Sequence, residues 1–166
     1  MTVQFVDYDP AVHGALDAWQ SEAISRFAMD GTIREEWQYY LDCDDYRAGV
    51  DVFCKVALME GQPVAAMIVF CHPDYPVGIN PMIVAPELRG RGIGRGVLVA
   101  FVEGIDDILP CRSDRIEVVI DMANAESIRL FTRAGFSARL HPDGDAYIFD
   151  KKFHEEVPPC PQPPPA

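Results

Sequence analysis

The chain has 166 residues, of which 49% are hydrophobic, so it is long and apolar enough for one globular domain with its own core. Its formal net charge of −12 argues against non-specific nucleic-acid binding, because phosphate backbones are held by cationic surfaces, and it favours a cationic or amine-bearing partner. No apolar run approaches the ~18 residues of a membrane span and "MTVQFVDYDP" shows no secretory signal, so we expect a cytoplasmic protein without a membrane segment.

The chain opens with a predicted strand followed by a helix. Alternating apolar residues predict a strand over Val3 to Tyr8. Asp9 is then a suitable N-cap, and Pro10 suits the first helical position. Apolar residues at helical spacing continue from there, and Asp30-Gly31 is expected to end the helix.

A second helix and an acidic loop complete the N-terminal part. Thr32 and Glu35 have the spacing of a capping box, which predicts a helix that runs to about Leu41. The segment from Asp42 to Gly49 is acidic and has no clear period, so we expect a loop there.

Three strands are predicted next. Val50 to Met59 and Val64 to Cys71 are apolar runs joined by "EGQP", which indicates a hairpin. A third strand covers Val77 to Val84 and contains Pro81. Because proline has no N–H to donate, one side of this strand is expected to be unpaired or bulged near Pro81.

The C-terminal half alternates helices and strands. Apolar spacing predicts a long helix over Gly92 to Leu109, a strand over Arg115 to Asp121 and a short helix over Asn124 to Ala134. Gly135 suits the left-handed position that closes this short helix. A final hairpin is predicted around "HPDGD" at residues 141–145.

The order of these elements predicts a mixed α/β sheet of the α+β type, antiparallel at first and containing a right-handed β-α-β crossover. We expect a single domain over residues 1–156. From Val157 to Ala166 six of ten residues are proline, so this segment is expected to be an extended tail that joins neither sheet nor helix.

The cysteines and histidines give no sign of a metal site. The cysteines are odd in number, no two form a C-x-x-C pair, and the four histidines are scattered. Together with the absence of a secretory signal, this favours reduced thiols and no bound metal. The cysteines are Cys43, Cys54, Cys71, Cys111 and Cys160.

The segment "VAPELRGRGIGRGVL", from Val84 to Leu98, carries the strongest functional signal. Its glycines fit neither the G-x-G-x-x-G spacing of a dinucleotide fingerprint nor a P-loop, which needs a Gly-Lys pair. What remains is an R-x-x-G-x-G turn between a strand and a helix. Backbone N–H groups at a helix start, with glycines that let them approach and arginines nearby, favour a bound anion such as a pyrophosphate.

These residues resemble the acyl-CoA-binding motif of the GNAT superfamily of N-acetyltransferases. The segment "NAESIRLFTRAGF", from Asn124 to Phe136, is similar to the second motif of that family. The resemblance covers about Gly78 to Phe136. It implies the GNAT fold, with a mixed central sheet of about six or seven strands and about four helices. In that fold the cofactor, acetyl-CoA, lies where the fourth and fifth strands splay apart.

The resemblance also implies which residues bind the cofactor. The strand segment of Met82, Ile83 and Val84 would bind the pantetheine arm through backbone groups of its first and last residues. Asn124 and Ser127 would meet the pantetheine or the adenosine side. The turn around the pyrophosphate would comprise Arg89, Gly90, Arg91, Gly92, Ile93, Gly94 and Arg95.

The expected catalytic groups depart from the family pattern. Where the family often has a proton-donating tyrosine the chain has Phe131, and the usual carboxylate position on the fourth strand is Gly78. The candidates that remain are Tyr147, Glu117 and Asn80, although an asparagine cannot act as a base. Other candidates are the loop residues His72, Asp74 and Tyr75, or a chain of water molecules that deprotonates the amine.

Selectivity for the acceptor is expected in the segment from Trp19 to Tyr46. Aromatic and acidic side chains around a cleft suit a cationic amine through charge and cation–π attraction, but the same residues also suit helices with an acidic outer face. The residues are Trp37, Tyr39, Tyr40 and Tyr46 with Asp30, Glu35, Glu36, Asp42, Asp44 and Asp45, and Arg34 is a countercharge.

The sequence therefore predicts an N-acetyltransferase. It would transfer an acetyl group from acetyl-CoA to a primary amine of a small molecule or peptide, directly and in a ternary complex. The alternative is a protein that binds CoA or acetyl-CoA with little or no catalysis. The sequence does not decide whether the chain forms a homodimer. We expect no nucleic acid, membrane or metal as a partner.

Overall fold

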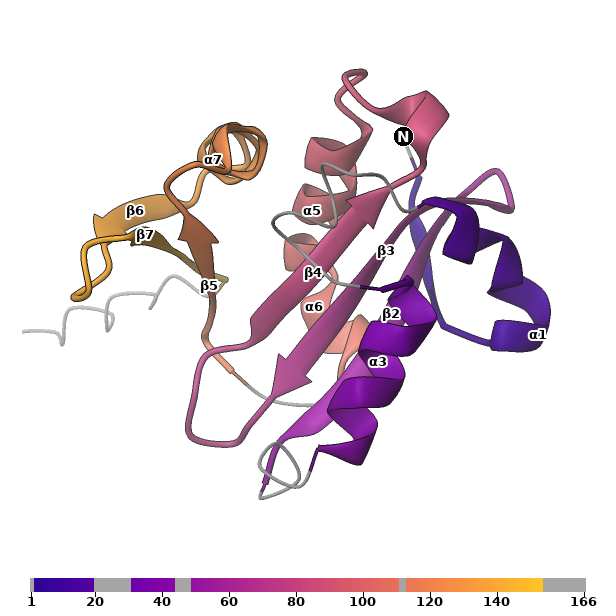
Figure 1. Cartoon of the computed structure of the whole chain (residues 1–166), viewed down its shortest axis with the longest axis horizontal. Coiled ribbons are helices and arrows are strands. Elements are labelled where there is room, and N and C mark those ends of the chain that lie inside the picture. The colour runs from indigo at the N-terminus through magenta and orange to yellow at the C-terminus, as the bar shows by residue number, and fades with distance from the viewer. Residues whose placement is uncertain (1, 20–30, 44–48, 111–112, 154–166) are drawn as a thin grey trace, which may run out of the picture.

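The computed structural model describes residues 2–19, 31–43, 49–110 and 113–153, and within them seven strands form two antiparallel sheets (Figure 1). The first sheet has the order β1-β2-β3-β4 and the second the order β5-β7-β6. The strands are β1 (Gln4–Asp7), β2 (Asp51–Met59), β3 (Gln62–Cys71), β4 (Gly78–Val84), β5 (Arg115–Asp121), β6 (Ser137–Leu140) and β7 (Ala146–Lys152).

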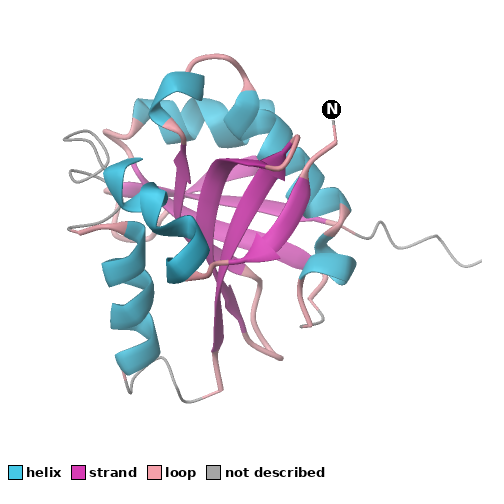
Figure 2. Ribbon diagram, turned by 90° about the vertical axis from the view of Figure 1, so that its right-hand side faces the viewer, coloured by secondary structure: helices cyan, strands magenta, loops and turns pink. Residues whose placement is uncertain are grey.

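Helices pack on both faces of the first sheet (Figures 1 and 2). Met67 and Val69 of β3 join the core beneath Phe101 of α5, while Ile68 between them joins the core beneath Ile33 of α3. This period of two is that of a strand buried on both sides. The helices are α1 (Pro10–His13), α3 (Ile33–Asp42), α5 (Ile93–Glu103), α6 (Ile105–Ile108) and α7 (Ala125–Arg133), with 3₁₀ turns η1 (Gly14–Trp19) and η2 (Pro86–Leu88).

The two predicted N-caps are confirmed. The Asp9 side chain accepts a hydrogen bond of 2.8 Å from the Ala11 N–H at the start of α1. At the start of α3, the Thr32 N–H donates to Glu35 Oε2 (2.8 Å) and the Glu35 N–H donates to Thr32 Oγ1 (3.2 Å). The two reciprocal bonds complete a capping box. Donation from the Thr32 N–H and from the Thr32 hydroxyl to the carboxylate lowers the pKa of Glu35.

Two predicted helices are divided by glycines. The first changes after His13 into the 3₁₀ turn η1, which begins at Gly14, and its further course over residues 20–30 lies outside the described residues. The helix predicted over 92–109 is α5 and α6, separated at Gly104. Apolar spacing did not reveal these breaks because it continues across them, whereas a glycine weakens the helix locally.

Cys71 is disulfide-bonded, so the expectation of reduced cysteines was wrong for this residue. Spacing along the chain could not show this, because a disulfide needs only two Cα atoms that are close in space. Cys43 and Cys54 are free thiols, and burial raises the pKa of Cys54 to about 12. The proline-rich tail lies outside the described residues.

No helix in the described ranges is both long and apolar enough to span a bilayer.

The end of α7 has the geometry that the sequence predicted. Gly135 has φ +83°, its N–H donates to the Thr132 carbonyl, and the Phe136 N–H donates to the Phe131 carbonyl, both at 3.1 Å. The Phe131 and Phe136 rings meet edge to face with centroids 5.0 Å apart. This is a Schellman motif with its hydrophobic contact, and it directs the chain from α7 into β6.

We predict that Gly135→Ala lowers the free energy of unfolding by about 1–2 kcal/mol, because a side chain disfavours the left-handed conformation by that amount. Gly14→Ala is the matched control, since Gly14 has φ −58° and an added Cβ meets nothing within 4 Å. Urea denaturation of both variants measures the difference. Equal midpoints for the two variants would contradict this account of the α7 terminus.

Candidate functional site

In the part of the chain that the structure describes, the two sheets are joined by one short parallel bridge, at Val77 and Ile116. The Val77 N–H donates to the Arg115 carbonyl (3.0 Å) and the Glu117 N–H donates to the Val77 carbonyl (2.9 Å). Beyond this bridge β4 and β5 belong to different sheets, and Figure 1 shows them diverging toward α7. The fourth and fifth strands therefore splay apart, as expected.

A bulge on β4 lies just after the bridge. Met82 is opposite Met67 and Ile79 is opposite Val69, so Asn80 and Pro81 together face one residue of β3. The irregularity expected at Pro81 is confirmed. Because a bulge shifts the alternation of side chains, Asn80 reaches the α3 side, where its Nδ2 lies 3.4 Å from the Tyr40 hydroxyl.

Beyond the bulge, β4 presents backbone groups to the space between the strands. The Ala85 N–H donates to the Val64 carbonyl at 3.0 Å, which places Ala85 in a hydrogen-bonded pair of the antiparallel ladder. Since such pairs alternate, Ile83 also bonds to β3, whereas the backbone groups of Met82 and Val84 point toward β5. The Ile83 side chain is buried beneath α3 and its backbone groups bond to β3, so Ile83 contributes no group to this edge.

A narrow cavity of about 70 Å³ lies between β4, β5 and α7. It brings together four residues that the sequence proposed as cofactor-binding or catalytic, namely Asn80, Met82, Asn124 and Ser127. The Asn124 side chain caps α7 by accepting from the Ser127 N–H at 3.1 Å. The rest of the lining is Ile79, Pro81, Val118, Val119, Ile120, Asp121, Leu130 and Phe131.

The glycine-rich turn leads from the end of β4 into α5. Gly90 (φ +73°) and Gly92 (φ +81°) adopt left-handed conformations, and Gly92 is an N-cap without a side chain. The first helical bond runs from the Gly96 N–H to the Gly92 carbonyl. The N–H groups of the preceding helical residues therefore lack an acceptor within the helix, at the end where the helix dipole is positive.

Gly94 lies where α5 approaches two other elements. A Cβ added there would lie 3.2 Å from Val84 Cγ2 of β4 and 3.6 Å from Leu130 Cδ1 of α7. This glycine therefore permits close packing, whereas Gly90 and Gly92 permit an unusual backbone conformation.

The three arginines of the turn have different surroundings. Arg89 Nε donates to the Val84 carbonyl (3.0 Å) and its Nη2 to the Trp19 carbonyl (2.8 Å), so its guanidinium ties the turn to η1. Arg95 Nε donates to the Arg133 carbonyl (2.9 Å) at the end of α7. Arg91 is exposed and has no hydrogen-bond or ion-pair partner among the described residues.

The structure does not bring Glu117 or Tyr147 into the cavity lining. Glu117 lies on the more exposed face of β5, where Arg139 Nη2 donates to its Oε2 at 2.9 Å. Tyr147 is half-buried on β7 and packs edge-on against Phe149. Phe131 is 5% exposed and lines the cavity with a ring that has no proton to give.

The acceptor segment is described only in part. Asp30, Asp44, Asp45 and Tyr46 lie outside the described residues. Tyr40 is buried against Phe70, with ring centroids 4.8 Å apart, while Tyr39 beside it is 60% exposed. Asn80 and Tyr40 are 40 residues apart in the sequence, so no local pattern predicts their contact. The one signal in the sequence was the expectation that aromatic residues of this segment surround the acceptor.

The loop candidates lie together before β4. The His72 and Tyr75 rings have centroids 4.6 Å apart, and His72 Nδ1 accepts from the Asp74 N–H at 3.0 Å. These contacts form a compact turn, and none of its residues lines the described cavity.

Comparisons with known proteins agree with this geometry. The model of the acetyltransferase (GNAT) family matches residues 16–136. Mycothiol acetyltransferase of Kineococcus radiotolerans is 28% identical over 132 residues, which cover 77% of this chain and 41% of that protein. The chain thus spans less than half the length of this curated relative.

Solved structures share the fold at low sequence identity. Aminoglycoside acetyltransferase AAC(6')-Ib in complex with coenzyme A superposes with a TM-score of 0.67 at 19% identity, over 91% of this chain and 95% of that one. The ribosomal-protein-S18-alanine N-acetyltransferase of Escherichia coli gives 0.64 at 12% identity, over 96% and 99%. The family match ends at Phe136, the last residue of the motif that begins at Asn124, and the chain belongs to the acetyltransferase (GNAT) family.

Proposed function

We propose that this protein is an N-acetyltransferase that transfers an acetyl group from acetyl-CoA directly to a primary amine in a ternary complex. The observation that carries the proposal is the inner edge of β4, where Met82 and Val84 present backbone groups to the splay. That edge leads directly into a helix start whose N–H groups have no acceptor within the helix.

The residues present fit the cofactor in chemical terms. The pantetheine arm of CoA carries amides, which can pair with the inner edge of β4 as a short strand would. The pyrophosphate suits the N-terminus of α5, with Arg91 as the adjacent cation. The Val84 carbonyl already accepts from Arg89, so Val84 would contribute its N–H and Met82 both of its groups. Bound acetyl-CoA supplies the acetyl thioester.

Asn80 and Tyr40 are the polar groups best placed to act on the acetyl carbonyl and the amine. An asparagine amide has two N–H donors, and only one is directed to the Tyr40 hydroxyl, so the second can donate to the acetyl oxygen. Asp121 is the one titratable residue of the described cavity lining, and it lies at the open end of the splay, where it accepts from the Ala123 N–H. The amine would therefore lose its proton to water.

The acceptor class stays broad in this proposal. The named relatives include an aminoglycoside acetyltransferase and an enzyme named for an alanine of a ribosomal protein, which represent a small-molecule and a peptide amine. The exposed Tyr39 and the net charge of −12 favour a cationic amine.

A binding protein with little catalysis is the second candidate. It is favoured by Phe131, which is buried at the position where the family often has a tyrosine hydroxyl, and by Gly78, which has no carboxylate. These two residues do not exclude catalysis, however. The reference pKa of a thiol is only about 8.5, so the thiolate of CoA can leave without a protein group that protonates it.

Two measurements test the proposal. Acetyl-CoA should raise the melting temperature, because a ligand that binds only the folded state stabilises it, and no shift at millimolar cofactor would overturn both candidates. Free-thiol release should then be measured with polyamines, aminoglycosides, amino acids and peptides with free N-termini. Cofactor binding without release on any amine would favour the binding protein.

We predict different effects for two arginines of the turn. Arg91→Ala should raise the Kd for CoA about tenfold, the equivalent of about 1.4 kcal/mol, and leave the stability unchanged. Arg89→Ala should lower the free energy of unfolding by about 2 kcal/mol, because two carbonyls lose a charged donor. Calorimetric titration and urea denaturation measure the two quantities.

Arg115→Ala is the control for these variants, since Arg115 is exposed on β5. If Arg91→Ala binds CoA as the wild type does, the position of the pyrophosphate is wrong.

We predict that Asn80→Ala lowers kcat about 10²-fold while the Kd for CoA stays unchanged, because the variant loses a donor to the acetyl oxygen. Glu117→Gln is the control and should keep the wild-type kcat, since its carboxylate pairs with Arg139 outside the cavity. Steady-state kinetics on the acceptor found in the screen measures both. A larger loss in Glu117→Gln than in Asn80→Ala would reverse the assignment.

A further inference from the structure

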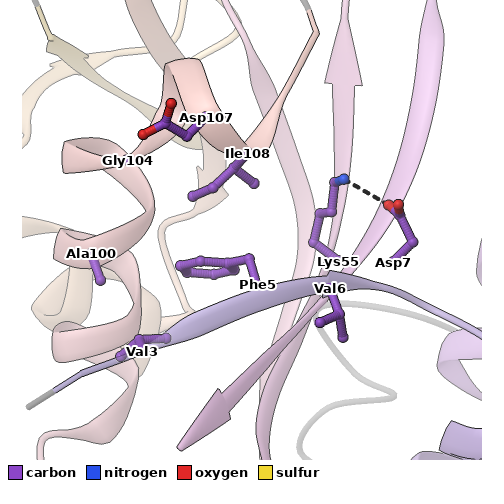
Figure 3. Close-up of a pocket in the computed structure, with 9 residues that line it drawn as sticks. All are labelled: Val3, Phe5, Val6, Asp7, Lys55, Ala100, Gly104, Asp107 and Ile108. Atoms are coloured by element: carbon purple, nitrogen blue, oxygen red, sulfur yellow. Dashed lines mark hydrogen bonds and ion pairs between the residues drawn. The ribbon is translucent and has the colours of Figure 1, made fainter.

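A second cavity lies at the opposite edge of the first sheet from the splay. It measures about 530 Å³, a size typical of small-molecule sites, and lies between β1, β2 and the helices α5 and α6 (Figure 3). β1 and β4 are the two edge strands of this sheet, so the cavity is separate from the proposed acetyl-CoA site. Nothing in the proposed reaction uses it.

The cavity contains a nearly buried cation. Lys55 is 8% exposed, and its Nζ donates to Asp7 Oδ1 at 2.6 Å across the β1–β2 pair. An ammonium has three N–H donors, and within the described residues Asp7 is its one hydrogen-bond partner. Its ammonium also lies 5.3 Å from the centroid of the Phe53 ring. Since burying a charge is costly, the free donors favour an anionic group as a further partner.

The neighbouring carboxylate faces solvent. The Asp7 side chain is 77% exposed, so its second oxygen can accept from a ligand while the first stays bonded to Lys55. In Figure 3 the Lys55 ammonium points toward Asp7, and Asp107 lies on the other side of the cavity. One end of the cavity therefore presents a cation and an anion side by side.

Besides this pair, the cavity is lined by apolar side chains and by the Asp107 carboxylate on its other side. The Phe5 ring and the Ile108 side chain lie between the Lys55–Asp7 pair and the helices, with Val3 beside them (Figure 3). These three side chains can cover an apolar group that lies next to the charges of a ligand.

We propose that this cavity binds a free α-amino acid with an apolar side chain. Its carboxylate would accept from Lys55, its ammonium would donate to Asp7, and its side chain would cover Phe5 and Ile108. An α-amino acid carries its two charges on adjacent atoms, which matches the adjacent charges of the pair. A simple anion would meet Asp7 and a chain of net charge −12, and a simple cation would meet Lys55.

Calorimetric titration of the full chain with free leucine tests the proposal, in the absence of CoA and of any acceptor. Two probes each lack one charge: isopentylamine has no carboxylate and 4-methylpentanoate has no ammonium. We expect saturable binding of leucine with one site per chain, and at least tenfold weaker binding of both probes.

Variants separate this cavity from the splay. Lys55→Met should weaken leucine binding at least tenfold, and Asp7→Asn should weaken it while 4-methylpentanoate binding is retained. Asp107→Asn, on the other side of the same cavity, is the matched control and should bind as the wild type. If Lys55→Met does not fold, Asp7→Asn decides, because Asp7 is exposed and its substitution leaves the core intact.

Three outcomes would overturn the proposal. They are no binding of leucine, valine, methionine or phenylalanine at millimolar concentration, isopentylamine binding as tightly as leucine, or unchanged leucine binding in both pair variants. The last outcome would place leucine elsewhere, for example at the acceptor site. Because no step uses CoA, failure here leaves the proposed acetyl transfer untouched, and the converse holds as well.

Discussion

The backbone bridge between Val77 and Ile116 determines where the two sheets of this fold separate. It holds β4 and β5 together at one point, after which the two strands belong to separate sheets. The twist of sheets favours divergence beyond such a point, and the bulge at Asn80 and Pro81 interrupts the regular ladder just after it. The result is a strand edge inside the molecule whose backbone groups have no neighbouring strand among the described residues.

The glycines and arginines of the glycine-rich turn have different structural roles. Gly90 and Gly92 give the backbone its left-handed conformations, and Gly94 lets α5 pack closely on β4 and α7. Arg89 and Arg95 are directed to backbone carbonyls of Val84, Trp19 and Arg133, which fixes the turn to its surroundings. Two of the three arginines that the sequence assigned to a bound anion are thus also tied to backbone carbonyls of the chain.

Local signals predicted the elements well. The capping residues Asp9 and Thr32, the irregularity at Pro81 and the left-handed Gly135 follow from backbone chemistry that needs no partner far along the chain. The family resemblance predicted that motif residues such as Met82 and Asn124 lie together at the splay. Three features could not be predicted from the sequence, because each depends on which distant segments the packing brings together. They are the Cys71 disulfide, the partners of Arg89 and the contact of Asn80 with Tyr40.

Hydrogen exchange of single amides, followed by NMR with and without CoA, tests the central claim most directly. The claim is that the inner edge of β4 is the binding edge for the pantetheine arm. Exchange at the Met82 and Val84 amides should slow on saturation with CoA, whereas the Ile83 amide, already bonded to β3, should exchange slowly in both states. Equal exchange at Met82 and Val84 with and without bound CoA would contradict the account.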